Sequence, residues 1–444
     1  MVEANVKVIE ELTYFLQTVA NDPSIRQLVT MDESDFSRQR KLTLERLVGI
    51  IINMPKRSLS IEIQQFFDSL GKGLESPTKG AFSLQRSKLK PLFFKVWNKW
   101  LVDNFYHYYG KKVKRWRGFQ LQAVDGSCAY LLNRPDVIDH FGNSTNQHAS
   151  IAMARVMQLQ DVLNDITVWG DIYPINESEK AIMARQVPHL ATDSLTLFDR
   201  GFPSYGLMYL LMNEETPRHF VMRCPTVFNK EVTLFSKSRK RSKIVMFYPS
   251  YKSINLLKEN GYKVTEKTPI KVRMVQVNLP NGEQEILLTN LYDEKLYSVE
   301  DLKYLYGLRW RIETVYNKQK NQLQLEQFSG VRVICIQQDY AAGLLVANLQ
   351  SLIEKQSVNY LKGINQRRKY NYQINRNISF ASLKYDIVHL FLLAEPIEIL
   401  IKLQQKFERY LEPVRPGRQY PRSTRKARRA YGKYQTFTNY KRAI

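Results

Sequence analysis

The first 110 residues carry a hydrophobic pattern with a helical period. Apolar side chains recur every three or four positions over residues 6–19 and again over residues 42–52. Such spacing places them on one face of an amphipathic helix, with polar residues on the other face. We therefore expect an all-helical domain over residues 1–110.

Within this region the pattern predicts two consecutive short helices. Ser60 is a candidate cap for the first helix, Gly71 and Gly73 would end it, and the second would begin after Pro77 and Thr78. We expect Phe82, Leu84 and Leu89 inside the second helix, and Gln85, Arg86, Lys88 and Lys90 outside it. The pair is typical of a DNA-contacting helix-turn-helix, although two ordinary packed helices explain the loose pattern equally well.

From residue 118 onward, short apolar runs alternate with helical stretches. Strands are expected over 121–124, 150–159, 165–173 and 195–198, and a helix over 177–190. This alternation predicts an α/β fold class, with a catalytic core over 118–220 and 292–335.

Residues 221–291 interrupt this core and are rich in β-forming residues. Two of the runs, 271–279 and 285–291, flank Asn281 and Gly282, which is a strong hairpin-turn signal. A basic loop precedes them, with Lys237, Arg239, Lys240, Arg241 and Lys243. We expect a β-rich insertion whose loop contacts DNA, the alternative being a solvated surface loop. Beyond it, residues 336–412 predict a helical C-terminal region, for which architecture alone suggests dimerisation.

The segment 306–320 carries the most informative polar pattern. Tyr306, Arg309, Glu313 and Lys320 follow the spacing Y-x2-R-x3-E-x6-K. At about 100° per residue on one α-helix, these four positions fall within an arc of roughly 60°. A neighbouring apolar face is expected to be buried and consists of Leu305, Leu308, Ile312, Val315 and Leu323. One helix would thus present an aromatic hydroxyl, a guanidinium, a carboxylate and an ammonium along the edge of a core.

Two of the expected strands end in an aspartate, Asp125 and Asp199. Carboxylates at strand ends point into the crevice where α/β folds bind ligands, although a single one is more often a turn residue. With Glu313 they form a set of three that can hold two divalent ions about 3.5–4 Å apart for phosphoryl displacement. Hard oxygen ligands favour Mg²⁺, with Mn²⁺ as a substitute. Asp161, Asp165 and Asp171 are alternatives for the second carboxylate, and Asp199 is preferred because it ends an apolar strand.

The other residues of the stripe suit a phosphate backbone. We expect Arg309 to bind phosphate as a fork, Lys320 as a point charge and Tyr306 as a hydroxyl donor. Neither a metal-ligand spacing of histidines, including His140, His148 and His189, nor a glycine-rich phosphate loop is present.

Charge and cysteine content narrow the class of protein. Lys and Arg total 66 against 42 Asp and Glu, a formal net charge of +24, so the expected partner is a polyanion, with double-stranded DNA first. Residues 413–444 hold ten Lys or Arg with interleaved aromatic residues and no acid, typical of a flexible DNA-binding tail. Three dispersed cysteines and no export or membrane signal favour a reducing cytoplasm, with no membrane partner and no small-molecule substrate.

Taken together, these motifs resemble the DDE transposases of bacterial insertion sequences, specifically the insertion-sequence-four group with its YREK signature. The resemblance rests on the four-residue stripe, on the Arg309-Trp310 pair, and on the contexts Asp125-Gly126-Ser127 and Asp199-Arg200-Gly201-Phe202. It covers about residues 118–330. It implies a ribonuclease-H-like core, two metal ions at Asp125, Asp199 and Glu313, a nucleoid-associated homodimer on paired ends, and excision through hairpin ends followed by strand transfer.

The resemblance also assigns DNA-binding roles. Tyr306, Arg309 and Lys320 would hold DNA near the cut, with Arg200 beside them, and Trp310 would accommodate a flipped base. Some relatives supply a second Trp from the insertion, but no Trp lies between Trp169 and Trp310 here. Another aromatic residue, such as Phe235, Phe247 or Tyr292, would have to cover the base. Two alternatives remain: a catalytically silent DNA-binding derivative, inhibitory or domesticated, and a ribonuclease-H-like nuclease without strand transfer.

Overall fold

The computed structural model describes the chain except for residues 39, 55, 146–149, 279–281, 393–394 and 416–444. The expected turn at Asn281 is therefore only partly described, and His148 and nearly all of the basic tail lie outside the described residues. The helices are α1 (Val2–Asn21), α2 (Pro23–Val29), α3 (Leu44–Ile52), α4 (Leu59–Ser69), α5 (Lys79–Arg86), α6 (Leu92–Tyr109), α7 (Pro135–Phe141), α8 (Glu179–Gln186), α9 (Tyr205–Met212), α10 (Lys230–Ser236), α11 (Tyr251–Glu259), α12 (Val299–Leu308), α13 (Trp310–Asn321), α14 (Val333–Gln356), α15 (Val358–Gln366), α16 (Arg376–Leu392) and α17 (Pro396–Arg409). The strands are β1 (Gln120–Tyr130), β2 (Asn143–Thr145), β3 (Ser150–Asp161), β4 (Ile166–Pro174), β5 (Ser194–Phe198), β6 (His219–Cys224), β7 (Ser242–Phe247), β8 (Ile270–Asn278), β9 (Gln284–Thr289), β10 (Asn371–Ile374) and β11 (Leu411–Val414). Short 3₁₀ turns cover Gly73–Glu75, Gly110–Lys112 and Val187–His189.

The N-terminal region is helical, as its pattern predicts. Val8, Leu12 and Leu16 of α1 recur every four residues, are buried, and lie on the helix that packs against α6. The first helix of the expected helix-turn-helix begins at Leu59, so Ser60 lies inside it and is not its cap. The second begins after Thr78, whose hydroxyl accepts a hydrogen bond from the Ala81 amide.

The assignment of inside and outside residues on α5 is wrong at three positions. Leu84 is exposed, whereas Gln85 and Arg86 are buried. The Arg86 guanidinium forms an ion pair with Asp339 of α14 at 2.8 Å and donates to Gln338 at 2.6 Å. A side chain expected to face DNA therefore ties the N-terminal helices to α14, because tertiary partners outweigh the local polar pattern.

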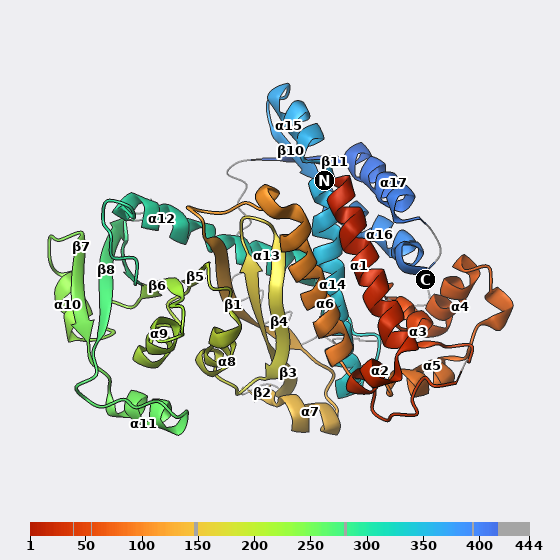
Figure 1. Ribbon diagram of the computed structural model, residues 1–444, viewed down its shortest axis with the longest axis horizontal. Helices are drawn as coiled ribbons and strands as arrows, with labels where there is room; N and C mark the ends of the chain where they lie inside the picture. The colour runs from red at the N-terminus through yellow and green to blue at the C-terminus, as the bar shows by residue number, and fades with distance from the viewer. Residues whose placement is uncertain (39, 55, 146–149, 279–281, 393–394, 416–444) are drawn as a thin grey trace.

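The central sheet has nine strands, and its first half has the topology of a ribonuclease-H-like core. The order is β4-β3-β1-β5-β6, with β3 antiparallel to β1 and β4, and with β5 and β6 parallel to β1. Figure 1 shows this sheet between the N-terminal helices on one side and the β7–β9 region on the other. The expected mixed α/β fold class, with helical regions at both ends, is confirmed.

The segment expected as an insertion continues the same sheet. β6 crosses the expected boundary at residue 221 and pairs in parallel with β5, so it belongs to the core. β9, β8 and β7 then extend the sheet as antiparallel neighbours, in that order from β6. The β-rich character of this segment was predicted, but its continuity with the core sheet was not.

The two faces of the sheet are buried in two hydrophobic cores. Leu121 and Ala123 of β1 face the larger core, which also contains α13, α14 and the N-terminal helices. Val124 faces the second core, formed with α8, α9 and the β7–β9 region. Alternation along one strand thus fixes which helices cover which face.

The helix α14 runs through the middle of the larger core, and nearly its whole length is buried. Gly170 of β4 permits this, because a Cβ at that position would lie 2.7 Å from the Leu344 Cδ1 atom. The C-terminal region is mostly helical but also contains the two-stranded ribbon β10–β11. Among the described residues, none of the helices combines the length and apolar character needed to span a lipid bilayer.

Candidate active site

Asp125 and Asp199 lie at matching positions of two neighbouring parallel strands. The last residue pair between β1 and β5 is Ala123 with Leu197, so each aspartate follows that pair by two residues on its own strand. Because strand residues two apart point the same way, both carboxylates are directed to one side of the sheet. The sequence pattern predicted that the first strand ends at Asp125. β1 instead continues to Tyr130, because it stays paired with β3.

Glu313 reaches this place from the first turn of α13. The sequence pattern placed the stripe on one helix, but the structure divides it between two, because α12 ends at Leu308 and α13 begins at Trp310. At this junction the Arg309 amide donates to the Tyr306 carbonyl at 3.1 Å, a three-residue spacing tighter than that of an α-helix. The five residues expected on the buried apolar face are nevertheless all buried.

Arg309 lies at the centre of the carboxylates. Its side chain is only 2% exposed, and its guanidinium donates to Glu313 Oε1 at 3.0 Å. The Tyr306 hydroxyl donates to Asp199 Oδ1 at 3.2 Å. Burial by itself lowers the pKa of Arg309, but nearby Tyr306, Asp199, Glu313 and Asp125 raise it overall, so the guanidinium stays charged.

The electrostatics of Asp125 reflect the same cluster. The pKa of its carboxyl is raised to about 6, chiefly by burial and further by nearby Glu313 and Asp199, while Arg309 and the Gly126 amide oppose the shift. The Tyr316 hydroxyl of α13 donates to the Asp125 backbone carbonyl at 2.8 Å and so joins the helix to β1. The structure therefore brings Asp125, Asp199, Glu313, Tyr306 and Arg309 into one electrostatic unit.

The carboxylates fit a hard divalent cation in their chemistry. All three present oxygen donors, and burial, with smaller contributions from Glu313 and Asp199, raises the Asp125 pKa, so a bound cation would favour the ionised carboxylate. Within the described part of the chain, no three Asp, Glu, His or Cys side chains are drawn together closely enough to hold a metal ion. The Arg309 guanidinium lies among these carboxylates and pairs with Glu313.

The remaining expected DNA-binding residues are differently placed. The Lys320 ammonium donates to the Cys128 carbonyl at 2.6 Å and pairs with Glu326 at 3.3 Å, so it already has protein partners. Trp310 is 49% exposed, with the Arg309 guanidinium 4.9 Å from its ring centroid. Arg200 is exposed and lines a cavity of about 700 Å³ next to Asp199.

The same cavity is lined by Arg223, a residue that sequence reasoning missed. Its guanidinium lies 3.9 Å from Asp199 Oδ1 and pairs with Glu285. Arg223 follows Met222, which pairs with Phe198, so it is the residue of β6 next to Asp199. Arg223 could have been found from the sequence if residues 219–224 had been recognised as a strand of the core.

None of the three aromatic residues considered as partners of Trp310 lies in this cavity. Phe235 and Phe247 are buried in the second core. The Tyr292 hydroxyl donates to the Lys271 carbonyl. Tyr292 follows the C-terminal end of β9, whereas Cys224, which lines the cavity, lies beside the N-terminal end of that strand.

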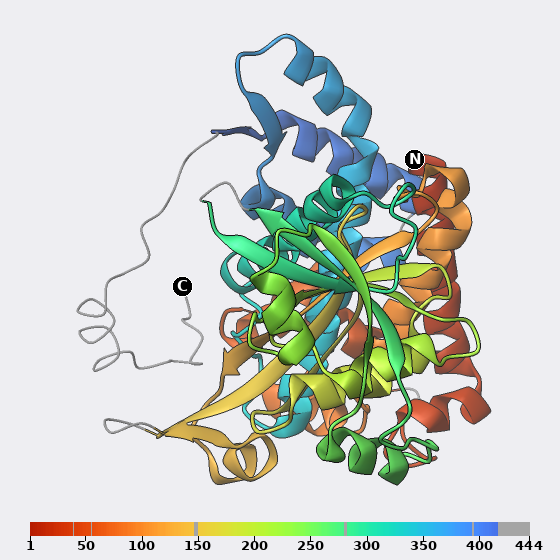
Figure 2. The ribbon, with the colours of Figure 1, turned by 90° about the vertical axis from the view of Figure 1, so that its left-hand side faces the viewer.

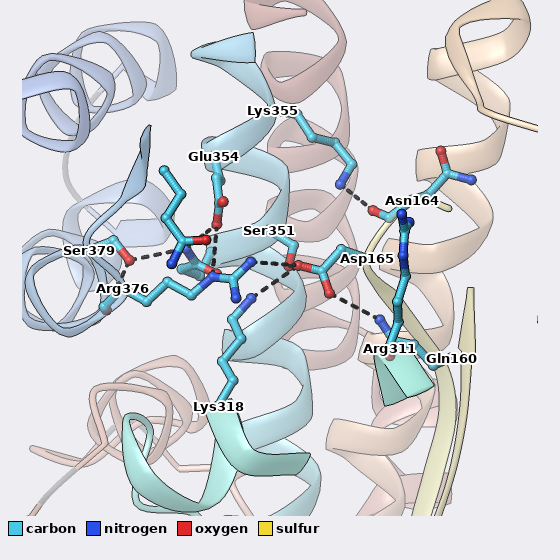
Figure 3. A network of polar contacts seen from close by, with 12 residues as sticks. Gln160, Asn164, Asp165, Arg311, Lys318, Ser351, Glu354, Lys355, Arg376 and Ser379 are labelled. Atoms are coloured by element: carbon cyan, nitrogen blue, oxygen red, sulfur yellow. Dashed lines mark hydrogen bonds and ion pairs between the residues drawn. The ribbon is translucent and has the colours of Figure 1, made fainter. Parts of the chain in front are cut away.

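A partly buried polar network links the helix that carries Glu313 to the β3–β4 turn and to α16 (Figure 3). Lys318 of α13 pairs with Asp165 in the β3–β4 turn at 3.2 Å, and Arg376 of α16 pairs with the same carboxylate at 3.7 Å. Arg311 donates to the Val162 carbonyl at 2.9 Å. Burial alone raises the pKa of Asp165, but Lys318, Arg376 and Lys355 together hold it well below its usual range.

The three alternative aspartates thus have other partners. Asp165 belongs to the network behind α13, Asp161 accepts from the Tyr106 hydroxyl at 2.8 Å, and Asp171 pairs with Lys95. Each lies among structural contacts of its own, whereas Asp199 contacts Tyr306.

Comparison with known proteins gives one family match and similarity to individual proteins. Residues 166–349 match the family model of the transposase DDE domain. This part of the chain is therefore similar to a transposase DDE domain. The match contains Asp199, Glu313 and the stripe and begins downstream of Asp125.

Individual proteins are more distant. The putative transposase InsZ of Escherichia coli (strain K12) is 26% identical over 110 residues, which cover 24% of this chain and 37% of that protein. The chain therefore aligns with little more than a third of the length of this relative. A cryo-EM structure of the piggyBac transposase synaptic complex with hairpin DNA overlaps 98% of this chain and 90% of its own at 12% identity, with a TM-score of 0.42.

Proposed function

We propose that this chain is a DNA transposase that cuts and rejoins DNA strands with the help of divalent metal ions. The observation that carries the proposal is the convergence of Asp125, Asp199 and Glu313 around one buried arginine, within a sheet of ribonuclease-H-like topology. The match of residues 166–349 to the transposase DDE domain supports the same reaction class.

Asp125, Asp199 and Glu313 would hold the metal ions, with Mg²⁺ favoured and Mn²⁺ as a substitute. Bound ions would activate the attacking oxygen and stabilise the leaving oxygen of an in-line displacement at phosphorus. Release of the Arg309–Glu313 contact would free Glu313 as a ligand, and the guanidinium would then be available to the scissile phosphate.

The other residues position this machinery. Tyr306 orients the Asp199 carboxylate through its hydroxyl, and Tyr316 fixes the backbone at Asp125. Arg200 and Arg223 line the cavity beside Asp199 and would meet the DNA backbone. Lys320, held by Cys128 and Glu326, would bind a phosphate only by exchanging one of these partners.

The YREK spacing supports a finer assignment to the insertion-sequence-four group. In that case a homodimer on paired ends would excise the element through hairpin intermediates, with Trp310 beside the flipped base. The exposure of Trp310 supports this role, since a stacking platform must be accessible.

The function is tested with a duplex that carries the ends of the chain's own element. Wild type should cut this duplex at the element's ends when Mg²⁺ or Mn²⁺ is present and not in EDTA, and Glu313→Gln should bind it without cutting. Binding by wild type without metal-dependent, end-specific cleavage would leave the catalytically silent derivative as the correct function. Cleavage without joining to a target would leave the nuclease.

The hairpin step has a separate test. Trp310→Ala should reduce hairpin formation more than first-strand nicking, because base stacking is needed only when the strand folds back. Tyr304→Ala is the matched control, because Tyr304 is another exposed aromatic residue of the same region, on α12. Equal loss of nicking and hairpin formation in Trp310→Ala would count against a flipped base.

A further inference from the structure

The C-terminal region contains a basic segment separate from both the stripe and the tail. Between Glu354 and Asp386 the chain has no acidic residue and seven basic ones: Lys355, Lys362, Arg367, Arg368, Lys369, Arg376 and Lys384. Four of these, Lys362 and the consecutive Arg367, Arg368 and Lys369, are exposed. Tyrosines are interleaved with them, at positions 360, 370 and 372.

α15 and β10 of this segment form a projecting arm together with β11, which comes from farther along the chain. α15 has no buried residue, and Figures 1 and 2 both show it and the ribbon standing out at one end of the molecule. The arm is nevertheless ordered. The Asn365 side chain of α15 accepts from the Tyr372 amide at 2.6 Å and donates to the Tyr372 carbonyl at 3.2 Å.

Three cations in and beside the arm lie over aromatic rings. The Arg368 guanidinium lies 4.6 Å from the Tyr372 ring centroid, and the Lys369 ammonium lies 5.7 Å from that of Tyr370. Arg409, next to β11, lies 5.6 Å from the Tyr410 ring. Among the described residues, the ion pairs present involve none of Lys362, Arg367, Arg368, Lys369 and Arg409. The arm therefore presents uncompensated positive charge in a fixed geometry.

The base of the arm connects to the helix that carries Glu313. Arg376, two residues after β10, pairs with Asp165, and Asp165 pairs with Lys318 of α13 (Figure 3). Arg376 also pairs with Glu354 of α14 at 3.7 Å. Ion pairs through Asp165 thus link the base of the arm to α13.

We propose that the α15–β10–β11 arm is a docking surface for the phosphate backbone of duplex DNA, separate from the DNA held at the catalytic carboxylates. Charge complementarity selects the partner, because exposed cations without carboxylate partners suit a polyanion and release its counterions on binding. The aromatic rings beneath these cations limit their mobility and so lower the entropy lost on binding. This docking role extends the proposed transposase function. It applies equally to a chain that binds DNA without cutting it.

The test removes three charges from the arm and, as a matched control, three from a distant surface. The arm variant combines Arg367→Gln, Arg368→Gln and Lys369→Gln. The control variant combines Lys252→Gln, Lys258→Gln and Lys263→Gln, three exposed lysines on and beside α11. Figure 1 shows α11 at the opposite end of the molecule from α15. Binding to a duplex of random sequence is measured by fluorescence anisotropy over a series of salt concentrations, with thermal unfolding as a check on folding.

The slope of log Kd against log salt concentration should become shallower by about 2–3 in the arm variant, because each lost phosphate contact contributes about 0.9. The control variant should change less. Arg409→Gln serves as the second variant. Arg409 is the last residue of α17, just before β11, and its loss should make the slope shallower by about 1. An arm variant whose slope changes no more than that of the control would overturn the proposal. Because the duplex carries no element ends and no cleavage is scored, failure of the arm is distinguishable from failure of the transposase function.

Discussion

At the residue scale, the candidate site depends on where two strands stop pairing. Asp125 and Asp199 both follow the last β1–β5 pair by two residues, and this geometry places their carboxylates side by side. The sequence predicted both aspartates and Glu313 because each stands beside an apolar element. It did not predict the burial of Arg309 among them, because a local sequence pattern does not show which polar residue becomes buried in the folded protein. Arg223 was missed because its strand had been assigned to the insertion.

The raised pKa of Asp125 predicts a pH-dependent stability of the metal-free protein. Its ordinary value is 3.8 and its value in the folded protein is about 6, so the folded state binds the proton more tightly than the unfolded state. The contribution of Asp125 to folding stability is therefore greatest below about pH 4 and falls as the pH rises through 6. Asp125→Asn should stabilise the protein in EDTA at pH 8, by on the order of 2 kcal/mol, and have little effect at pH 4. Urea denaturation at both pH values measures this, and an equal effect at both would contradict the assignment.

Arg309 supplies the positive charge at the centre of the site, so its removal should unbalance the carboxylates. Arg309→Gln should lower the free energy of unfolding in EDTA by about 1–3 kcal/mol, because the charge-assisted hydrogen bond to the partly exposed Glu313 is lost. Mg²⁺ should recover part of this loss by replacing the missing cation. Arg134→Gln, which removes an exposed arginine paired with Asp136, should change stability by less than about 1 kcal/mol. Denaturation curves with and without Mg²⁺ decide, and a loss that Mg²⁺ leaves unchanged would argue against a metal site here.

At the element scale, the elements themselves were predictable but two of their boundaries were not. β1 passes through Asp125-Gly126-Ser127, which looks like a turn, because β3 pairs with it along this stretch. The stripe is divided between α12 and α13 at Arg309, although its spacing fits one helix. In both cases a partner distant in the sequence decides the local conformation, and a local pattern carries no information about it.

The network behind α13 predicts a strong effect of a residue outside the site. Asp165→Asn leaves Lys318 and Arg376 without their shared carboxylate and should lower the free energy of unfolding by about 1–3 kcal/mol, because the carboxylate is partly exposed and its ion pairs are partly screened. Asp103→Asn, which removes the exposed carboxylate of the Lys99 pair on α6, should cost less than about 1 kcal/mol. Chemical denaturation of the two variants measures the difference. Similar small losses would show that the network does not stabilise α13.

At the scale of the whole molecule, one sheet joins the core to the β7–β9 region, and positive charge is spread over several surfaces. The net charge of +24 predicted a polyanion as partner, and the strand order agrees with the core expected from the resemblance. The sequence did not predict the arm, because its basic residues lie in a region assigned to dimerisation. An acid-free stretch with interleaved tyrosines was the available signal.

The basic tail should contribute to DNA binding independently of the arm. Removal of residues 416–444 deletes nine of the ten positive charges present in 413–444. We expect weaker binding to a random-sequence duplex and a shallower salt dependence, because fewer counterions are released. Combination of the deletion with the arm variant should give nearly additive changes in slope. A slope unchanged by the deletion would remove the tail from the DNA interface.

The account rests on Asp125, Asp199 and Glu313 acting together as the catalytic carboxylates. The most direct measurement compares Mg²⁺-dependent cleavage of element ends by wild type, Asp125→Asn, Asp199→Asn, Glu313→Gln and the control Asp103→Asn, at protein concentrations that saturate DNA binding. The account predicts that each of the first three substitutions abolishes cleavage while binding persists, and that the control cuts as wild type does. Cleavage at near wild-type rates by any one of the three would contradict it.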